Sequence, residues 1–202
     1  MTLLSPLFDA IEADDFARVK DALEKGADVN ASATGDYRWT PLMCAASSSS
    51  SPEIFKLLLE SGAEVNARAL YDETPLMYAA MNSSSPEIVT LLLAKGAEIE
   101  ARDKDGWTPL MLAARYSSTP EIVTLLLEKG AEIAVRDKDG WTPLMVAAAF
   151  SSTPEIVMLL LAKGADALAK DEDGKKAIDH AKRNDKLKDT KAYWKLHDKS
   201  FE

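Results

Sequence analysis

Apolar residues recur along the chain in blocks that repeat every 34 residues. In each block a short segment rich in Leu, Met and Ala is followed by a second one with apolar residues at helical spacing, such as Ile54, Leu57 and Leu58. A Ser-Pro or Thr-Pro pair precedes each segment. This pair is typical of a helix start, because the hydroxyl can accept an exposed N–H and proline fits the first turn. The pattern therefore predicts pairs of short helices.

Three markers keep this period in four copies. Thr-Pro-Leu-Met begins at Thr40, Thr74, Thr108 and Thr142; Pro-Glu-Ile begins at Pro52, Pro86, Pro120 and Pro154; Gly-Ala begins at Gly62, Gly96, Gly130 and Gly164. The glycine suits a helix end, and the Asp-Lys-Asp-Gly runs that start at Asp103 and Asp137 predict tight turns. Repetition at such a period indicates a stack in which each helix pair buries its apolar side against the next.

These residues resemble the ankyrin repeat, whose pattern has Thr-Pro-Leu-His, a Leu-Leu run and Gly-Ala-Asp-Val-Asn. The resemblance implies an all-α ankyrin-repeat solenoid of about six helix-turn-helix repeats joined by β-hairpin loops, in a single domain over residues 1–202. Residues 1–35 would form an N-terminal capping repeat, residues 36–173 four internal repeats, and residues 174–202 a C-terminal capping repeat.

The chain departs from the family pattern in three places. The period is 34 rather than about 33, and the extra residue lies between the helices of a pair, where we expect a longer loop. Gly26 and Thr40 are 14 positions apart, whereas Gly62 and Thr74 are 12 apart, so the first hairpin has two additional residues. Methionine replaces the family's histidine, and we expect packing to take over from its polar bonding, at Met43, Met77, Met111 and Met145.

A stack of this kind presents a stiff concave face made of hairpin tips and first helices. The resemblance implies that a partner is contacted by the hairpin tips, by the residue before Thr-Pro-Leu and by the ends of the first helices. On this chain these positions are Tyr37, Arg38, Trp39, Leu70, Tyr71, Glu73, Met81, Asn82, Lys104, Asp105, Trp107, Arg115, Tyr116, Lys138, Asp139, Trp141 and Phe150. The set is rich in aromatic residues, which dominate binding hot spots. Either the three tryptophans take part in this aromatic stripe, or they pack against neighbouring hairpins as scaffold.

Charge narrows the class of partner. The chain has a net charge of −9, which argues against nucleic acid, because phosphate binding requires clustered Lys and Arg. From Lys170 onward there are 10 basic and 8 acidic residues, so residues 1–169 have a net charge of −11. We expect a monomer that binds a protein partner with a basic surface. The basic end is either a second contact site or a solvated cap.

Membrane contact is not expected, because no apolar run approaches the ~20 residues that a span requires. The start of the sequence lacks the basic and apolar regions of a signal peptide, so we expect a cytoplasmic location.

Residues that could carry chemistry are few. Cys44 is the only cysteine and lies far along the chain from His180 and His197, so neither a Cys-His pair nor a zinc site is expected. We expect Cys44 to be a small core residue. The Asp-Lys-Asp-Gly runs lack the glycine and glutamate positions of a calcium loop. The sequence thus predicts no catalytic residue, no metal and no cofactor.

The leading hypothesis is a non-catalytic protein–protein interaction module that binds through its concave face. One alternative is a structural or engineered scaffold without a specific natural ligand, since residues 102–130 and 136–164 are nearly identical. Another is a small-molecule binder in the groove, which would require a pocket with convergent polar groups.

Overall fold

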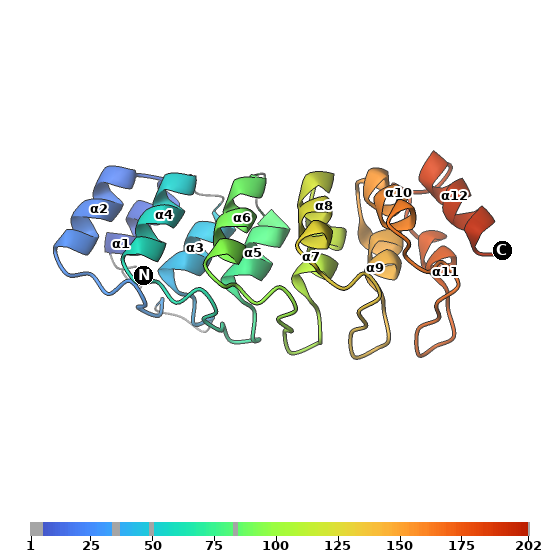
Figure 1. The fold of residues 1–202 in the computed structure, drawn as a ribbon, viewed down its shortest axis with the longest axis horizontal. Helices are drawn as coiled ribbons and strands as arrows, with labels where there is room; N and C mark the ends of the chain where they lie inside the picture. The colour runs from blue at the N-terminus through green and yellow to red at the C-terminus, as the bar shows by residue number, and fades with distance from the viewer. Residues whose placement is uncertain (1–5, 34–36, 49–50, 83–84, 202) are drawn as a thin grey trace. The chain divides into compact units, whose positions relative to one another are not determined.

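The fold is taken from a computed structural model. It describes four stretches of the chain: residues 6–33, 37–48, 51–82 and 85–201 (Figure 1). The chain forms two compact units, unit 1 (residues 1–98) and unit 2 (residues 99–202).

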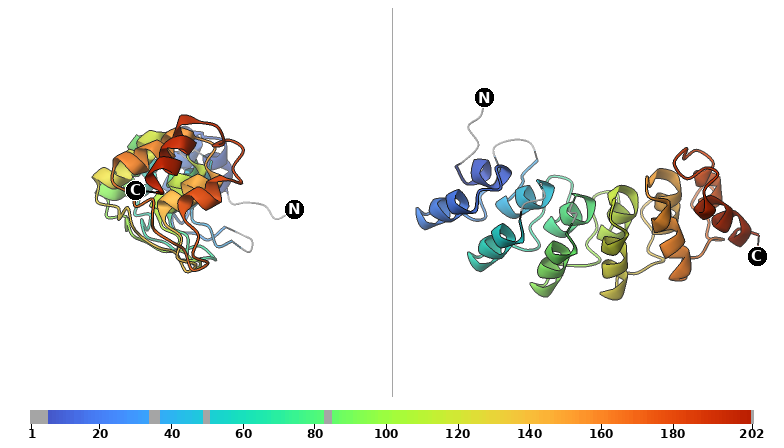
Figure 2. Two further views of the ribbon diagram at one scale, coloured as in Figure 1. Left: turned by 90° about the vertical axis from the view of Figure 1, so that its right-hand side faces the viewer. Right: turned by 90° about the horizontal axis from the view of Figure 1, so that it is seen from above.

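Each unit contains three pairs of α-helices within its described residues. Unit 1 holds α1 (Pro6–Glu12), α2 (Phe16–Glu24), α3 (Pro41–Ser47), α4 (Pro52–Glu60), α5 (Pro75–Asn82) and α6 (Pro86–Ala94). Unit 2 holds α7 (Pro109–Tyr116), α8 (Pro120–Glu128), α9 (Pro143–Phe150), α10 (Pro154–Ala162), α11 (Ala177–Ala181) and α12 (Lys191–Lys199). In each unit, first helices pack on first helices and second helices on second helices (Figure 2). The predicted all-α fold of about six paired repeats is confirmed.

The first helices begin as predicted. The Thr40 hydroxyl accepts the N–H of Met43 at 3.4 Å, and the same bond recurs at Thr74, Thr108 and Thr142. The prediction for the second helices was wrong in one detail: Ser51, Ser85, Thr119 and Thr153 occupy the cap position, but their side chains make no capping bond. The chain turns tightly there, so the backbone carbonyl of the cap residue accepts the exposed N–H instead. In α4 the N–H of Ile54 donates to the carbonyl of Ser51, and in α8 the N–H of Ile122 donates to that of Thr119, both at 3.0 Å.

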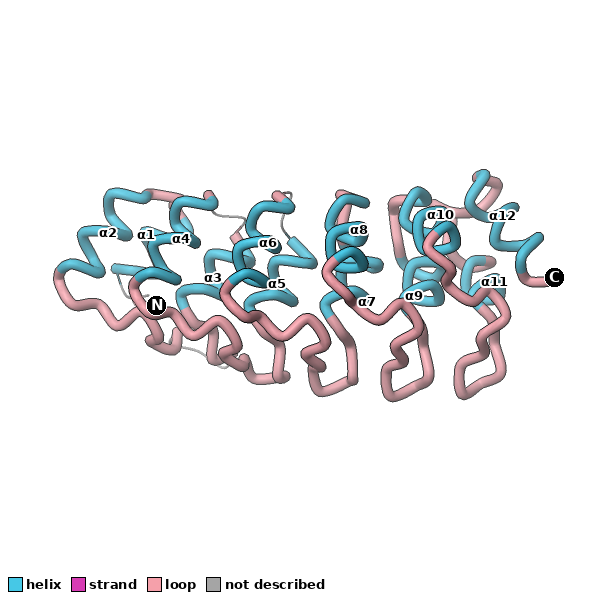
Figure 3. The backbone as a smooth tube through the Cα atoms, in the orientation of Figure 1, coloured by secondary structure: helices cyan, strands magenta, loops and turns pink. Residues whose placement is uncertain are grey.

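The second helices end at the predicted glycines. Gly62 has φ +92°, a left-handed backbone that glycine adopts without steric cost. Within each unit, the hairpins that follow all project from the same end of the helix pairs (Figure 3). In the hairpin of residues 103–106 the carboxylate of Asp103 accepts the N–H groups of Asp105 and Trp107, which confirms the predicted tight turn. The additional residues of the first hairpin involve residues 34–36, which lie outside the described residues.

Short side chains and methionines form the core between neighbouring first helices. Met43, Met77, Met111 and Met145 are fully buried, which confirms that packing occupies the position of the family's histidine. Cys44 is buried too, as expected, and burial raises the pKa of its thiol to about 12. Across the described part of the chain, no helix has the length and apolar character needed to cross a membrane.

Candidate functional site

The residues predicted to contact a partner lie on the hairpins and on the ends of the first helices. We call the side of each unit that they form its hairpin face. All seventeen are exposed or half-buried. Among these seventeen residues, the aromatic side chains with the largest exposed fractions are Tyr37 (62%), Tyr71 (50%), Tyr116 (48%) and Phe150 (45%). The tryptophans Trp39, Trp107 and Trp141 are half-buried.

In unit 1 the tryptophan joins the first described hairpin to α5. The indole N–H of Trp39 donates to the hydroxyl of Tyr78 at 2.8 Å, and the two rings meet edge to face at 5.0 Å. Burial raises the pKa of Tyr78 to about 12, and the negative charge of Glu73 acts in the same direction. Tyr37 lies beside Trp39 at 6.2 Å between ring centroids. Trp39 therefore has a structural bond, while Tyr37 remains exposed.

In unit 2 an arginine holds several aromatic rings together. The guanidinium carbon of Arg115 lies 4.2 Å from the ring centroid of Phe150, 4.8 Å from that of Tyr116 and 5.4 Å from that of Trp107. Such contacts contribute about 0.5–2 kcal/mol each, depending on exposure. Arg115, Trp107, Tyr116 and Phe150 form what we call the arginine–aromatic cluster. Their mutual contacts fix the rings before any partner arrives.

Trp141 extends this arrangement toward the last repeat. Its ring stacks on Phe150, with centroids 5.6 Å apart and planes inclined by 13°, and lies 4.1 Å from the ring of His180. The Nε2 atom of His180 is 2.7 Å from the buried carboxylate of Asp171. Burial alone would raise the pKa of Asp171, but hydrogen bonds from the Lys175 N–H and from His180 hold it below its ordinary value. The imidazole is therefore fixed against Trp141.

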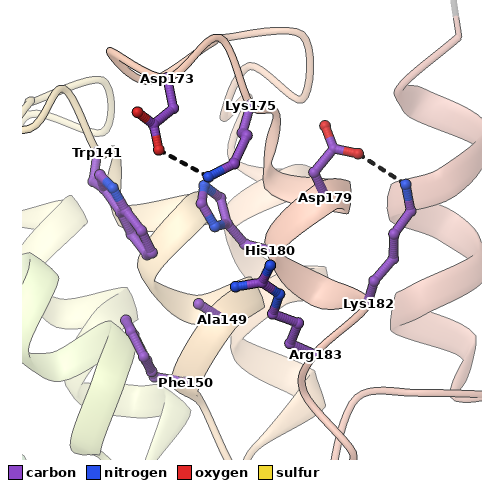
Figure 4. Close-up of a pocket in the computed structure, with 9 residues that line it drawn as sticks. All are labelled: Trp141, Ala149, Phe150, Asp173, Lys175, Asp179, His180, Lys182 and Arg183. Atoms are coloured by element: carbon purple, nitrogen blue, oxygen red, sulfur yellow. Dashed lines mark hydrogen bonds and ion pairs between the residues drawn. The ribbon is translucent and has the colours of Figure 1, made fainter.

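A cavity of about 680 Å³ lies beside Trp141 (Figure 4). Its lining includes His180, Arg183 and Lys175, which the sequence-based prediction did not include. One signal could have identified Arg183: it lies two periods of 34 residues after Arg115, with Ala149 at the same register between them.

The hairpin tips of unit 2 are tied to one another through the backbone. The N–H of Lys138 donates to the carbonyl of Asp105, and the N–H of Glu172 donates to the carbonyl of Asp139, both at 3.1 Å. Arg136 reinforces the link by donating to the carbonyls of Gly140 and Lys170, both at 2.7 Å. The side chains at the hairpin tips are thus attached to a backbone that hydrogen bonds hold rigid. This geometry suits binding, because a partner would not have to order the loops.

Groups suited to metal binding are absent from the described residues: no three His, Cys, Asp or Glu side chains gather as a metal site would require. The chemistry that the hairpin face offers is therefore aromatic stacking, cation–π contact and ion pairing.

Comparison with known proteins identifies the repeat. The family model described as "Ankyrin repeats (3 copies)" matches residues 3–69, 68–137 and 118–192. A comparison with curated proteins finds no match. Ankyrin repeat domains are generally protein–protein interaction modules and are typically non-catalytic. With matches from residue 3 to residue 192, and with paired helices, Thr-Pro caps and glycine-ended second helices in the structure, the chain belongs to the ankyrin repeat family.

Proposed function

We propose that the protein is a non-catalytic interaction module that binds one partner protein through its hairpin faces, with the arginine–aromatic cluster of unit 2 as the main contact. The observation that carries the proposal is that Tyr116 and Phe150 are exposed and yet held in place. Both are nearly half exposed, and both are held against Arg115. Aromatic and arginine side chains contribute most of the energy at protein interfaces, and rings that are already fixed lose little entropy on binding.

Tyr37 and Tyr71 provide the corresponding exposed rings of unit 1. Trp39, Trp107 and Trp141 combine two roles in this proposal: their half-buried rings support the exposed aromatics and leave one part open to a partner. The charged tips contribute electrostatics. Exposed acids such as Asp105 and Asp139, together with the net charge of −11 over residues 1–169, favour a partner with a basic surface.

The test is affinity isolation of binding proteins with the full chain and with a Tyr116→Ala/Phe150→Ala variant. We expect a specific partner whose affinity falls about tenfold or more in the variant, because each lost ring is a hot-spot anchor. Trp194→Ala is the matched control, since Trp194 is a similarly exposed aromatic (52%) on α12, outside the proposed face.

Quantitative proteomics would compare the captured proteins, and circular dichroism would check that each variant is folded. If the captured proteins are the same for the full chain and for the double variant, the proposal is wrong. Capture of no specific protein by the full chain would instead favour a scaffold without a specific ligand.

A further inference from the structure

We propose that the cavity beside Trp141 binds a peptide segment of the partner in which an acidic side chain adjoins a large apolar one. The carboxylate would bind Arg183, and the apolar side chain would lie on Trp141 and Phe150. This inference rests on the proposed function, because it assigns a part of the partner to one place on the hairpin face of unit 2.

The cavity has the size and the apolar wall that such a segment requires. Its volume of about 680 Å³ falls within the range of about 300–1,000 Å³ that is usual for ligand sites. Trp141 and Phe150 lie on one side of it, and their nearly parallel rings form a flat apolar surface (Figure 4). The short side chain of Ala149 leaves the space between them and Arg183 open.

The charges around the cavity leave one cation for a ligand. Three basic and two acidic side chains line it. Lys175 pairs with Asp173 and Lys182 pairs with Asp179, each at 2.8 Å. Among the described residues Arg183 has no ion-pair partner, and its guanidinium extends toward the side that holds Trp141 and Phe150 (Figure 4). A carboxylate is the group that matches a guanidinium best, because two parallel N–H···O bonds can form.

The repeat register explains why Arg183 differs from Arg115. Both occupy the same position of their repeats, but Arg115 lies in the last turn of α7, whereas Arg183 follows the end of α11 by two residues. Arg115 lies over Phe150 of the following repeat, 4.2 Å from the ring centroid. In the described part of unit 2 no aromatic ring lies over Arg183 in this way. The aromatic contacts that occupy the guanidinium of Arg115 are therefore missing at Arg183 within the described residues.

The surroundings of Trp141 favour a polypeptide over a free small molecule. On its hairpin side Trp141 borders a second hollow, of about 200 Å³, lined by acidic residues that include Asp139 and Glu172. On the other side lies Arg183. A peptide that crosses Trp141 can place a basic side chain against the hairpin tips and an acidic one on Arg183. The single carboxylate that the cavity requires is therefore compatible with a partner whose surface is mainly basic.

The test uses the full chain and the probe peptide Ac-Gly-Lys-Gly-Glu-Phe-Gly-NH2, titrated by ¹⁵N-resolved NMR. We expect shifts of the backbone amides of Trp141, Ala149, Phe150 and Arg183. Replacing the peptide's glutamate by glutamine should weaken binding about tenfold, because the charge-assisted bonds are lost. Arg183→Ala should do the same. Ala149→Met, which fills the cavity and keeps the charge, should weaken binding about as much.

Lys186→Ala is the matched control, since it removes one exposed positive charge outside the cavity and should change affinity by less than about twofold. Equal binding of the glutamine peptide, or no binding at millimolar concentration, would overturn the proposal. So would 3-phenylpropionate binding as tightly as the peptide, because the site would then be one for a free small molecule. If the peptide fails while the partner remains sensitive to Tyr116→Ala/Phe150→Ala, the cavity proposal alone is wrong. A partner insensitive to that double variant removes the proposed function, and with it the role of Phe150 in the cavity.

Discussion

Unit 1 and unit 2 repeat the same helix pair but differ in a column of buried side chains in their first helices. Unit 1 has Cys44 and Tyr78 in this column, whereas unit 2 has Leu112 and Val146. All four side chains are buried. In the four internal repeats the same backbone thus encloses two ionisable groups in unit 1 and only hydrocarbon in unit 2, whose last repeat has His180 at this register. In these four repeats the position is buried, whereas the chemistry of its side chain differs.

The hairpins of the two units also differ at a second repeat position. It is the residue before the position that holds Trp39, Trp107 or Trp141. Its φ is positive in every described hairpin of this kind. Unit 1 has Arg38 (+56°) and Asp72 (+65°) there, and unit 2 has Gly106 (+86°), Gly140 (+77°) and Gly174 (+75°). A side chain in this region costs roughly 1 kcal/mol relative to glycine. Unit 1 therefore carries strain at its tips that unit 2 avoids.

The largest difference should appear at alkaline pH. The folded-state pKa values of Cys44 and Tyr78 are raised to about 12 from 9.0 and 10.0. Above pH 9 the unfolded chain loses these protons while the folded chain keeps them, so stability falls as pH rises toward 12. From pH 9 to pH 11 the two groups together should lower the free energy of unfolding by about 4 kcal/mol. Urea unfolding followed by circular dichroism at several pH values measures this loss.

Two variants sharpen the comparison. Cys44→Ala/Tyr78→Phe should remove most of the alkaline dependence, although its stability at pH 7 will differ. Leu112→Cys in that background should restore a dependence of about half the size, now in unit 2. A double variant with an unchanged pH profile would show that burial of these groups is not the cause.

The second prediction concerns the close approach of neighbouring hairpins in unit 2. A Cβ added at Gly140 would lie 3.2 Å from the backbone nitrogen of Glu172, and φ at this position is positive. Gly140→Ala should therefore lower the free energy of unfolding by about 2–3 kcal/mol, because steric contact adds to the backbone cost. Gly164→Ala is the control: its φ is also positive, but nothing lies within 4 Å of the added Cβ. It should cost only about 1 kcal/mol. Equal losses in urea unfolding would show that the contact is unimportant.

The sequence predicted the features that depend on one repeat alone. The Thr40 type of cap, the glycine ends of the second helices and the turn at Asp103 follow from local chemistry, and all are present. Two features were missed for different reasons. Ser51 does not cap through its side chain because its own backbone carbonyl accepts the N–H of Ile54. The cavity at Arg183 depends on contacts between repeats, which the pattern of one repeat does not specify. Within each unit the predicted contact residues are exposed or half-buried on the hairpin face, as the register of the repeat predicted.

The smallest predicted effect comes from removing the backbone strain at one hairpin tip of unit 1. Asp72→Gly should raise the free energy of unfolding by about 0.5–1 kcal/mol, because glycine adopts φ +65° without steric cost. The bond from Arg68 survives, since it goes to the backbone carbonyl of residue 72. Asp105→Gly is the matched control, because this exposed tip residue has no positive φ, and added chain freedom should lower stability by a similar amount. If Asp72→Gly also destabilises the protein in urea, the side chain at the tip is stabilised by contacts that outweigh its backbone strain, and the two units do not differ in this respect.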